Sequence, residues 1–211
     1  MKIKVCGMKY HKNIAGVATF DPDYMGFIFT HHSKRFVGKN FEAAALECIP
    51  KNILKIGVFV DHPVASMHQT AVKYDLNGIQ LHGSETPLHC EALKALGHTV
   101  IKAFQMDENF DFELLQQYEP VADYFLFDAP SNCFGGSGKV FNWQILSQYQ
   151  GTTPFFLSGG LGLRNIRKLL ELRHPQLYGL DFNSRLETKP GFKKEHSVQL
   201  IINKIKKYDR I

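Results

Sequence analysis

The chain has 211 residues, of which 44% are hydrophobic and 21% are charged, and its formal net charge is +5. These values are typical of a globular protein and exclude an intrinsically disordered or fibrous chain. The longest apolar runs, such as 154–157, fall far short of the roughly 18 residues that cross a bilayer, so we expect no membrane-spanning helix.

The amino terminus and the cysteines indicate a cytoplasmic protein. Residues 1–7 lack the apolar stretch and the cleavage site of a secretory signal. The cysteines have no CxxC spacing, so we expect free thiols rather than disulfides or a zinc site. They are Cys6, Cys48, Cys90 and Cys133.

The densest basic segment runs from Lys193 to Arg210. Such a segment can bind nucleic acid, but here it coincides with an amphipathic pattern, and we interpret it as the solvated face of a terminal helix. We therefore expect no nucleic-acid partner.

Eight short apolar runs rich in β-forming residues recur along the chain. In chain order they are Lys2–Cys6, Tyr24–Phe29, Leu54–Val60, Gly78–Leu81, Thr99–Phe104, Tyr124–Asp128, Pro154–Ser158 and Tyr178–Phe182. Helical patterns separate most of them, with apolar faces made of Val64, Met67, Ala71 and Tyr74, of Ile166, Leu169 and Leu170, and of Val198, Ile201, Ile202, Ile205 and Tyr208. The first helix, between Tyr10 and Ala18, is short.

This alternation predicts parallel βαβ units, and eight of them predict a single-domain α/β fold, a (β/α)₈ TIM barrel spanning residues 1–211. An open doubly wound sheet would use about five or six strands and a glycine-rich fingerprint after the first, and the sequence has neither feature. In such barrels the active site lies at the carboxyl ends of the strands. This rule selects Asp61, His82 and Asp181, among other strand-end residues. We take Gln80, His82 and Asp181 as the candidate substrate-binding residues.

Cys6 ends the first strand and shares strand parity with Lys4, so both side chains are expected to point into the barrel. A thiol there is either a small buried hydrophobe or a general base. With a reference pKa of about 8.5, only a few per cent of the thiol is ionised at neutral pH, and a nearby cation such as Lys4 would favour the thiolate.

Asp128 ends the sixth strand and is either a proton donor or an acceptor for loop amides. A proton donor needs a raised pKa, which burial or a substrate carboxylate would supply. The glycine-rich segment 130–139 that follows is either a connector or a lid that closes over the site.

Two loops predict a phosphate site. Gly159 and Gly160 follow the seventh strand, and Asn183 and Ser184 follow the eighth. Glycine lets the main chain approach an anion closely, and the loops after these two strands often bind phosphate in such barrels.

Arg35, in the loop after the second strand, presents a planar guanidinium suited to a carboxylate. It follows His31 and His32. Adjacent histidines seldom share one ion and no third ligand is evident, so we expect no metal.

A series of motifs extends in order along nearly the whole chain. They are KVCGM (4–8), GFIF (26–29), SKRFV (33–37), GVFV (57–60), IQLHG (79–83), FD (127–128), GGSGKVFNW (135–143), SGGL (158–161), DFNSRLE (181–187) and PG (190–191). Together they resemble the phosphoribosylanthranilate isomerase family.

The resemblance implies a cofactor-free Amadori rearrangement of tryptophan biosynthesis, from N-(5-phosphoribosyl)anthranilate to 1-(2-carboxyphenylamino)-1-deoxyribulose 5-phosphate. By the same resemblance, Asp128 is the general acid that opens the ribose ring, and Cys6 is the general base that takes the C2 proton. Arg35 would bind the anthranilate carboxylate, while Gly160 and the 183–184 turn would hold the phosphate.

The chain departs from the family pattern in places. Arg185 stands where the family commonly has glycine, which either alters the path of the phosphate turn or adds a cation to it. Lys34 replaces the usual proline before Arg35, and Asn142 replaces the usual aspartate before Trp143.

Two other functions remain open at this point. Another phosphate-binding barrel enzyme, such as indoleglycerol-phosphate synthase, would need a catalytic lysine and glutamate at the strand ends, where this chain has Cys6 and Asp128. A barrel that kept phosphate binding without catalysis would be a sensor or a scaffold, and Arg185 leaves room for this alternative. A monomer and a homodimer are equally compatible with the pattern.

Overall fold

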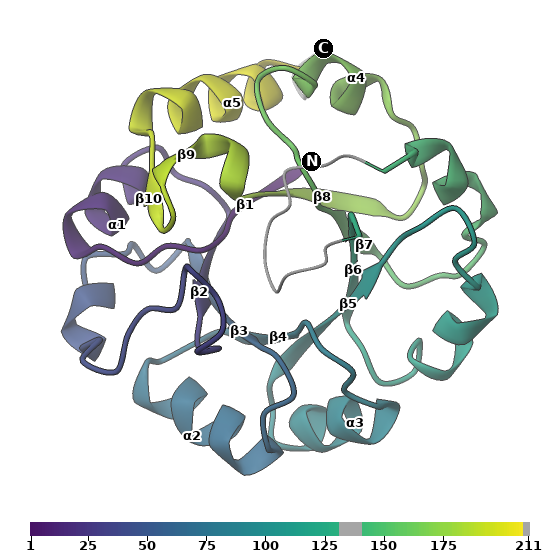
Figure 1. Ribbon diagram of the computed structural model, residues 1–211, viewed down its shortest axis with the longest axis horizontal. Helices are drawn as coiled ribbons and strands as arrows, with labels where there is room; N and C mark the ends of the chain where they lie inside the picture. Colours follow the sequence, from purple (N-terminus) through teal and green to yellow (C-terminus); the bar gives the residue numbers. More distant parts are fainter. Residues whose placement is uncertain (131–140, 209–211) are drawn as a thin grey trace.

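The computed structural model describes residues 1–130 and 141–208, and its centre is a closed barrel of eight parallel strands (Figure 1). The strands are β1 (Lys2–Val5), β2 (Tyr24–Ile28), β3 (Leu54–Phe59), β4 (Gly78–Leu81), β5 (Thr99–Gln105), β6 (Tyr124–Asp128), β7 (Phe155–Leu157) and β8 (Leu177–Phe182). Each strand pairs with the next one along the chain, and β1 also pairs with β8, which closes the barrel. The predicted (β/α)₈ barrel is confirmed.

Each observed strand coincides with one of the eight predicted apolar runs, and no end differs by more than one residue. The strands lie between helices outside and packed side chains inside, so both faces are buried, and a nearly continuous apolar run is the expected pattern. All five residues of β2 and all four of β4 are buried.

Five α-helices surround the described part of the barrel: α1 (His11–Ala18), α2 (Val64–Lys73), α3 (Pro87–Ala95), α4 (Ile166–Glu171) and α5 (Glu195–Tyr208). The predicted apolar faces point inward. Met67 and Ala71 of α2 are buried, as are Ile166 and Leu169 of α4. Four buried residues of α5, Val198, Ile201, Ile202 and Ile205, attach the carboxyl-terminal helix to the barrel.

Three of the connections hold, in the part of the chain that the structure describes, only short 3-10 helices: η1 (Ala43–Leu46), η2 (Phe112–Gln117) and η3 (Trp143–Gln148). Each has four to six residues, fewer than two α-helical turns, and tertiary packing rather than helix propensity therefore determines its conformation. After β8 the chain forms a fourth, η4 (Ser184–Leu186), and a small hairpin of β9 (Glu187–Lys189) and β10 (Phe192–Lys193).

The interpretation of residues 193–210 as one solvated helix face was wrong at its first residue. Lys193 belongs to β10 and is fully buried, and α5 begins only at Glu195. The Lys193 ammonium lies 2.7 Å from the Glu187 carboxylate and 2.7 Å from Asn183 Oδ1. A buried ammonium needs such partners because an unpaired buried charge is costly.

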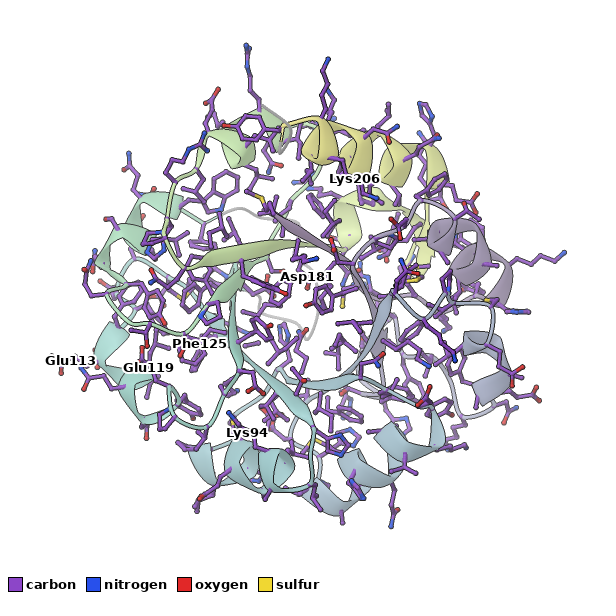
Figure 2. All side chains as sticks on the ribbon, turned by 180° about the vertical axis from the view of Figure 1, so that it is seen from behind. Lys94, Glu113, Glu119, Phe125, Asp181 and Lys206 are labelled. Carbon is purple, nitrogen blue, oxygen red and sulfur yellow. The ribbon has the colours of Figure 1, made fainter. Side chains whose placement is uncertain are left out.

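Most charged side chains lie on the outer ring of the molecule. In the view from behind, Lys94, Glu113 and Lys206 lie among the outer helices, whereas Asp181 lies near the barrel axis (Figure 2). No helix in the described ranges is long and apolar enough to span a membrane. The buried charges near the axis identify the region of functional interest.

Candidate active site

A cavity opens at the carboxyl ends of the strands and brings together most of the residues that the sequence singled out. Its lining consists of Cys6, Ile28, Thr30, Ser33, Val58, Val60, Gln80, His82, Gln105, Asp128, Ser158, Gly159, Gly160, Leu161, Asp181, Asn183 and Ser184. All the predicted site residues except Arg35 are among them. The side chains of Cys6 and Asp128 therefore share one cavity.

Cys6 follows β1 directly, and its backbone N–H donates to the carbonyl of Phe182 at 2.9 Å. The residue is only 3% exposed. Gly26 on the neighbouring strand makes room for the thiol, because a methyl group on this glycine would lie 2.6 Å from Cys6 Sγ. A side chain at residue 26 would therefore displace the thiol.

Lys4 lies below Cys6 inside the barrel and is completely buried. Its ammonium donates to Asp181 Oδ2 at 2.9 Å and to Gln80 Oε1 at 2.8 Å. Burial lowers the pKa of Lys4, but the Asp181 carboxylate and the Cys6 thiol more than offset this effect and raise it, so Lys4 stays charged.

The sequence suggested that a cation beside Cys6 would favour the thiolate. Lys4 does act in that direction, but burial raises the pKa of the Cys6 thiol by more than Lys4 lowers it. In the substrate-free protein Cys6 is therefore a thiol at neutral pH. Any additional stabilisation of the thiolate would have to come from a molecule bound in the cavity.

Asp128 is the last residue of β6, and both of its carboxylate oxygens have partners. Oδ1 accepts from the backbone N–H of Ala129 at 3.0 Å, and Oδ2 lies 3.2 Å from His82 Nε2. His82 in turn contacts the Gln80 amide through Nδ1 at 2.7 Å. The alternative role of Asp128 as an acceptor for a loop amide is thus also present.

The loops after β7 and β8 form one wall of the cavity. Gly159 and Gly160 have φ angles of +90° and +64°, a left-handed region that glycine adopts without strain. A Cβ on Gly159 would lie 2.5 Å from Ala129. Among the described residues, none accepts a hydrogen bond from the backbone N–H of Gly160 or of Ser184. Backbone N–H groups that lack an acceptor at such turns can form an anion-binding concavity.

Arg35 does not line the cavity. It is 6% exposed, and its guanidinium donates to both Glu187 oxygens, with an Nη2 to Oε2 distance of 2.7 Å. Lys193 contacts the same carboxylate, so this cluster holds two cations and one anion. In the substrate-free structure the guanidinium is thus paired with Glu187, and its contact with a substrate carboxylate stays a prediction.

Arg185 lies on η4 and is exposed, and its Cβ lies against Gly162 of the loop after β7. The η4 turn forms with arginine at this position, so the change from the common glycine does not unfold the phosphate turn.

Sequence reasoning missed several cavity residues, including Thr30, Gln105 and the apolar side chains of Ile28, Val58 and Val60. Gln105 was detectable, since it ends β5 and the strand-end rule applies to it. Thr30 Oγ1 and Asp181 Oδ1 are buried and have no hydrogen-bond partner within the described ranges. Such atoms cost desolvation energy unless a partner satisfies them, and both of these residues line the cavity.

The predicted lid, 130–139, lies almost entirely outside the described residues, and so does Cys133. Cys6, Cys48 and Cys90 are free thiols, as expected. In residues 1–130 and 141–208, no three histidine, cysteine or acidic side chains are arranged to hold a metal ion.

Comparisons with known proteins agree with this geometry. A profile of the family described as N-(5′phosphoribosyl)anthranilate (PRA) isomerase matches residues 3–204. The N-(5′-phosphoribosyl)anthranilate isomerase of Phocaeicola vulgatus is 44% identical over 206 residues, which cover 98% of each chain.

Two solved structures share the fold closely. One is phosphoribosyl anthranilate isomerase in complex with reduced 1-(o-carboxyphenylamino)-1-deoxyribulose 5-phosphate, with a TM-score of 0.84, 26% identity and coverage of 98% of this chain and 99% of that one. The other consists of monomers generated from the dimeric isomerase of Thermotoga maritima, with the same TM-score, identity and coverage.

Proposed function

The chain belongs to the N-(5′-phosphoribosyl)anthranilate isomerase family, and we propose that Cys6 and Asp128 perform the acid–base chemistry of its reaction in the cavity at the barrel mouth. The enzyme catalyses the Amadori rearrangement of N-(5-phosphoribosyl)anthranilate to 1-(2-carboxyphenylamino)-1-deoxyribulose 5-phosphate in tryptophan biosynthesis. The other barrel enzymes and the non-catalytic scaffold considered from the sequence are thereby set aside.

The order of the strands carries the proposal. Around the closed barrel, β7 and β8 lie between β6 and β1. The anion-binding wall on β7 and β8 is therefore flanked by Asp128 on one side and Cys6 on the other. A sugar held by its phosphate at this wall has one catalytic group at each side, as an acid–base pair requires.

Asp128 acts as the general acid. It donates a proton to the ribose ring oxygen, the bond from that oxygen to C1 breaks, and the anthranilate nitrogen forms a protonated Schiff base with C1. Ala129 and His82 hold the two oxygens of this carboxyl group, which fixes its orientation toward the ribose ring oxygen.

Cys6 acts as the general base. It takes the proton from C2, the electrons of the broken C–H bond neutralise the Schiff base, and the resulting enolamine tautomerises to the ketone. The positive Schiff base beside the sulfur stabilises the thiolate, which offsets the burial that raises its pKa in the substrate-free protein.

The remaining side chains bind and orient the substrate. Backbone N–H groups of Gly159, Gly160, Asn183 and Ser184 hold the phosphate. Asp181 Oδ1, which has no partner among the described residues, accepts from a sugar hydroxyl, while Gln80 and His82 border the same space. Ile28, Val58 and Val60 form an apolar wall for the aromatic ring.

Arg35 supplies positive charge for the anthranilate carboxylate. Burial lowers the pKa of Lys193 to about 8, so Lys193 is still largely protonated at pH 7. The cluster of Arg35, Lys193 and Glu187 therefore carries one net positive charge. Glu187 fixes the plane of the guanidinium.

The test is an assay of the purified protein with no metal or nucleotide added. Phosphoribosylanthranilate is generated in place from anthranilate and phosphoribosyl pyrophosphate, and the loss of its fluorescence is followed. We expect consumption of the substrate at a rate proportional to the protein concentration. Unchanged fluorescence with folded protein would remove the proposal.

We also propose that the enzyme acts in the cytoplasm as a monomer or a homodimer. The free thiols of Cys6, Cys48 and Cys90 support a reducing compartment, and one solved relative is described as dimeric. Sedimentation equilibrium of the purified protein distinguishes the two assembly states.

A further inference from the structure

A chain of hydrogen bonds crosses the barrel mouth and determines where the proton of His82 lies. An ammonium can only donate, so Lys4 fixes the Gln80 amide with Oε1 toward itself and Nε2 away from it. Nε2 lies 2.7 Å from His82 Nδ1. Because an amide NH₂ only donates, Nδ1 must be the acceptor and carries no proton.

The neutral imidazole then has its proton on the other ring nitrogen. His82 Nε2 lies 3.2 Å from Asp128 Oδ2, so the ring donates its N–H to the carboxylate. The alternative tautomer would place two donors face to face at Nδ1 and two lone pairs face to face at Nε2. The direction of every bond in the chain thus follows from the single charge of Lys4.

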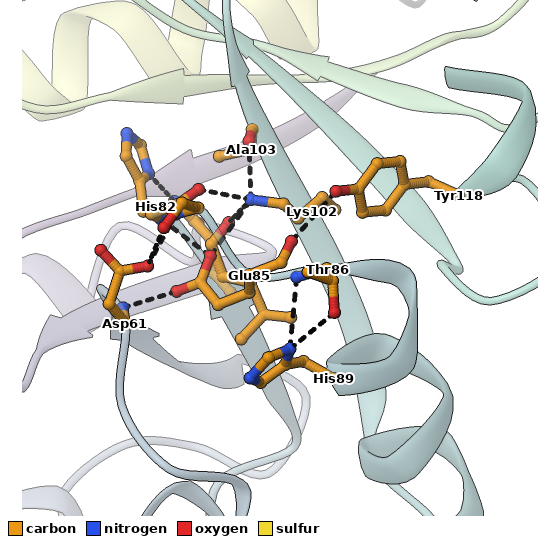
Figure 3. Close-up of polar contacts among 12 residues, drawn as sticks. Asp61, His82, Glu85, Thr86, His89, Lys102, Ala103 and Tyr118 are labelled. Atoms are coloured by element: carbon orange, nitrogen blue, oxygen red, sulfur yellow. Dashed lines mark hydrogen bonds and ion pairs between the residues drawn. The ribbon is translucent and has the colours of Figure 1, made fainter. Parts of the chain in front are cut away.

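A second group of contacts fixes the backbone directly after His82 (Figure 3). Lys102, which is 2% exposed, donates to the carbonyl of Gly83 at 2.7 Å and to Glu85 Oε2 at 3.1 Å. Glu85, also 2% exposed, accepts from the backbone N–H of Gly83 at 2.9 Å and of Asp61 at 2.8 Å.

This pair lies beside the catalytic cavity rather than in its lining, and nothing in the acid–base chemistry uses its charges. A buried ion pair contributes little net stability compared with apolar side chains of the same size. What this pair does provide is a rigid connection between strand β5, which carries Lys102, and the loops after β3 and β4, directly beside His82.

We propose that Gln80 and the buried Glu85–Lys102 pair are positioning residues that hold His82 as a fixed, neutral hydrogen-bond donor to Asp128. The carboxyl group of Asp128 is thereby kept in one orientation toward the ribose ring oxygen. The inference rests on the proposed acid role of Asp128, but the tautomer of His82 can be measured independently of that role.

The first test is the ¹⁵N NMR spectrum of the histidine-labelled protein at neutral pH, with the His82 signals assigned by their loss in His82→Ala. We expect an unprotonated Nδ1 and a protonated Nε2 in the wild type. In Gln80→Glu, a carboxylate of the same shape accepts instead of donating, and we expect Nδ1 to become protonated. A mixture of tautomers in the wild type, or an unchanged spectrum in Gln80→Glu, would overturn the proposal.

The second test is kinetic. His82→Ala removes the hydrogen bond that orients the Asp128 carboxyl group, and this should lower kcat on the order of tenfold with a smaller change in KM. The matched control is His89→Ala, whose ring only caps helix α3 through Thr86 and should leave kcat unchanged (Figure 3). Wild-type kcat in folded His82→Ala contradicts the proposal.

The role of the ion pair is tested by the double variant Glu85→Gln with Lys102→Met, which avoids leaving either charge buried alone. We expect a second His82 conformation in the NMR spectrum and a kcat close to that of His82→Ala. A folded double variant with the wild-type spectrum and kcat removes the pair from the proposal. If the double variant fails to fold, the results for Gln80→Glu and His82→Ala decide whether the proposal stands. Unchanged turnover in Asp128→Asn would instead refute the acid role and leave the tautomer result standing.

Discussion

At the amino-terminal end of the barrel interior, Phe156 packs edge-on against Tyr24 and Tyr178, with ring centroids 5.3 Å apart in both pairs. At the carboxyl end of the same interior, Lys4 and Asp181 form an ion pair that is almost wholly buried. One end is closed by aromatic rings, and the other contains charges and unpartnered polar atoms.

The difference shows how one fold separates stability from chemistry. Aromatic packing buries apolar area and repays the entropy of folding. Buried charges and unpartnered polar atoms do the reverse in the absence of a substrate, because each costs desolvation energy. The carboxyl end is therefore stabilised by the rest of the barrel.

The largest expected effect is on turnover at the carboxyl end. Cys6→Ser and Asp128→Asn should each lower kcat by about 10²–10⁴-fold, because each removes one positioned proton transfer. The affinity for reduced 1-(o-carboxyphenylamino)-1-deoxyribulose 5-phosphate should change much less. Cys48→Ser and Asp75→Asn are the matched controls, since both residues are exposed and far from the cavity lining. A wild-type kcat in either Cys6→Ser or Asp128→Asn would show that this residue of the carboxyl end does not take part in the chemistry.

At the opposite end, Phe156→Ala should lower the free energy of unfolding by about 3–5 kcal/mol, because a fully buried aromatic ring is replaced by a cavity. Urea denaturation measures the loss. The kcat of the remaining folded protein should stay that of the wild type. A fall in kcat without a loss of stability would show that the aromatic cluster supports catalysis rather than folding.

The pH dependence of kcat/KM tests whether Cys6 must lose its proton before it can act as the base. Burial raises the pKa of Cys6 above the ordinary value of a free thiol, so the thiolate fraction should rise with pH, by up to about tenfold per pH unit between pH 7 and 9. Lys193, with a pKa of about 8, titrates in the same range. The rate of Cys6 alkylation by iodoacetamide, followed by mass spectrometry, reports the thiol alone. A rate independent of pH over this range would mean that Cys6 is already a thiolate.

The smallest effect is expected for Tyr178→Phe. This change removes the hydroxyl that lies 2.8 Å from the Tyr24 hydroxyl and keeps the ring in the aromatic cluster. The loss should be about 1 kcal/mol in the free energy of unfolding, with unchanged kcat. A loss as large as that of Phe156→Ala would mean that the hydrogen bond, rather than ring packing, stabilises this end.

The barrel could be predicted from the sequence because its strands are apolar runs of characteristic length, and their number fixes the closure. The parity of Lys4 and Cys6 likewise predicted two inward side chains. The same parity relates Gln80 to His82, so the link between these two residues in the hydrogen-bond chain could also be predicted from the sequence.

Ion pairs between residues that are far apart in the sequence could not be predicted in this way. Arg35 and Glu187 are 152 residues apart, and no local pattern links them. Lys193 precedes a basic helix and its charge pattern predicts that it belongs to it, but the short β9–β10 hairpin places it beside Glu187. Whether a charge is buried depends on its distant partner, and a periodicity in one segment contains no information about that partner.

The most direct measurement is a crystal structure of this enzyme with reduced 1-(o-carboxyphenylamino)-1-deoxyribulose 5-phosphate bound. We predict phosphate oxygens within hydrogen-bonding distance of the backbone N–H groups of Gly160 and Ser184, with Cys6 Sγ beside C2 and the Asp128 carboxyl on the other side of the sugar chain. A phosphate bound elsewhere, or either side chain turned away from the ligand, would contradict the account.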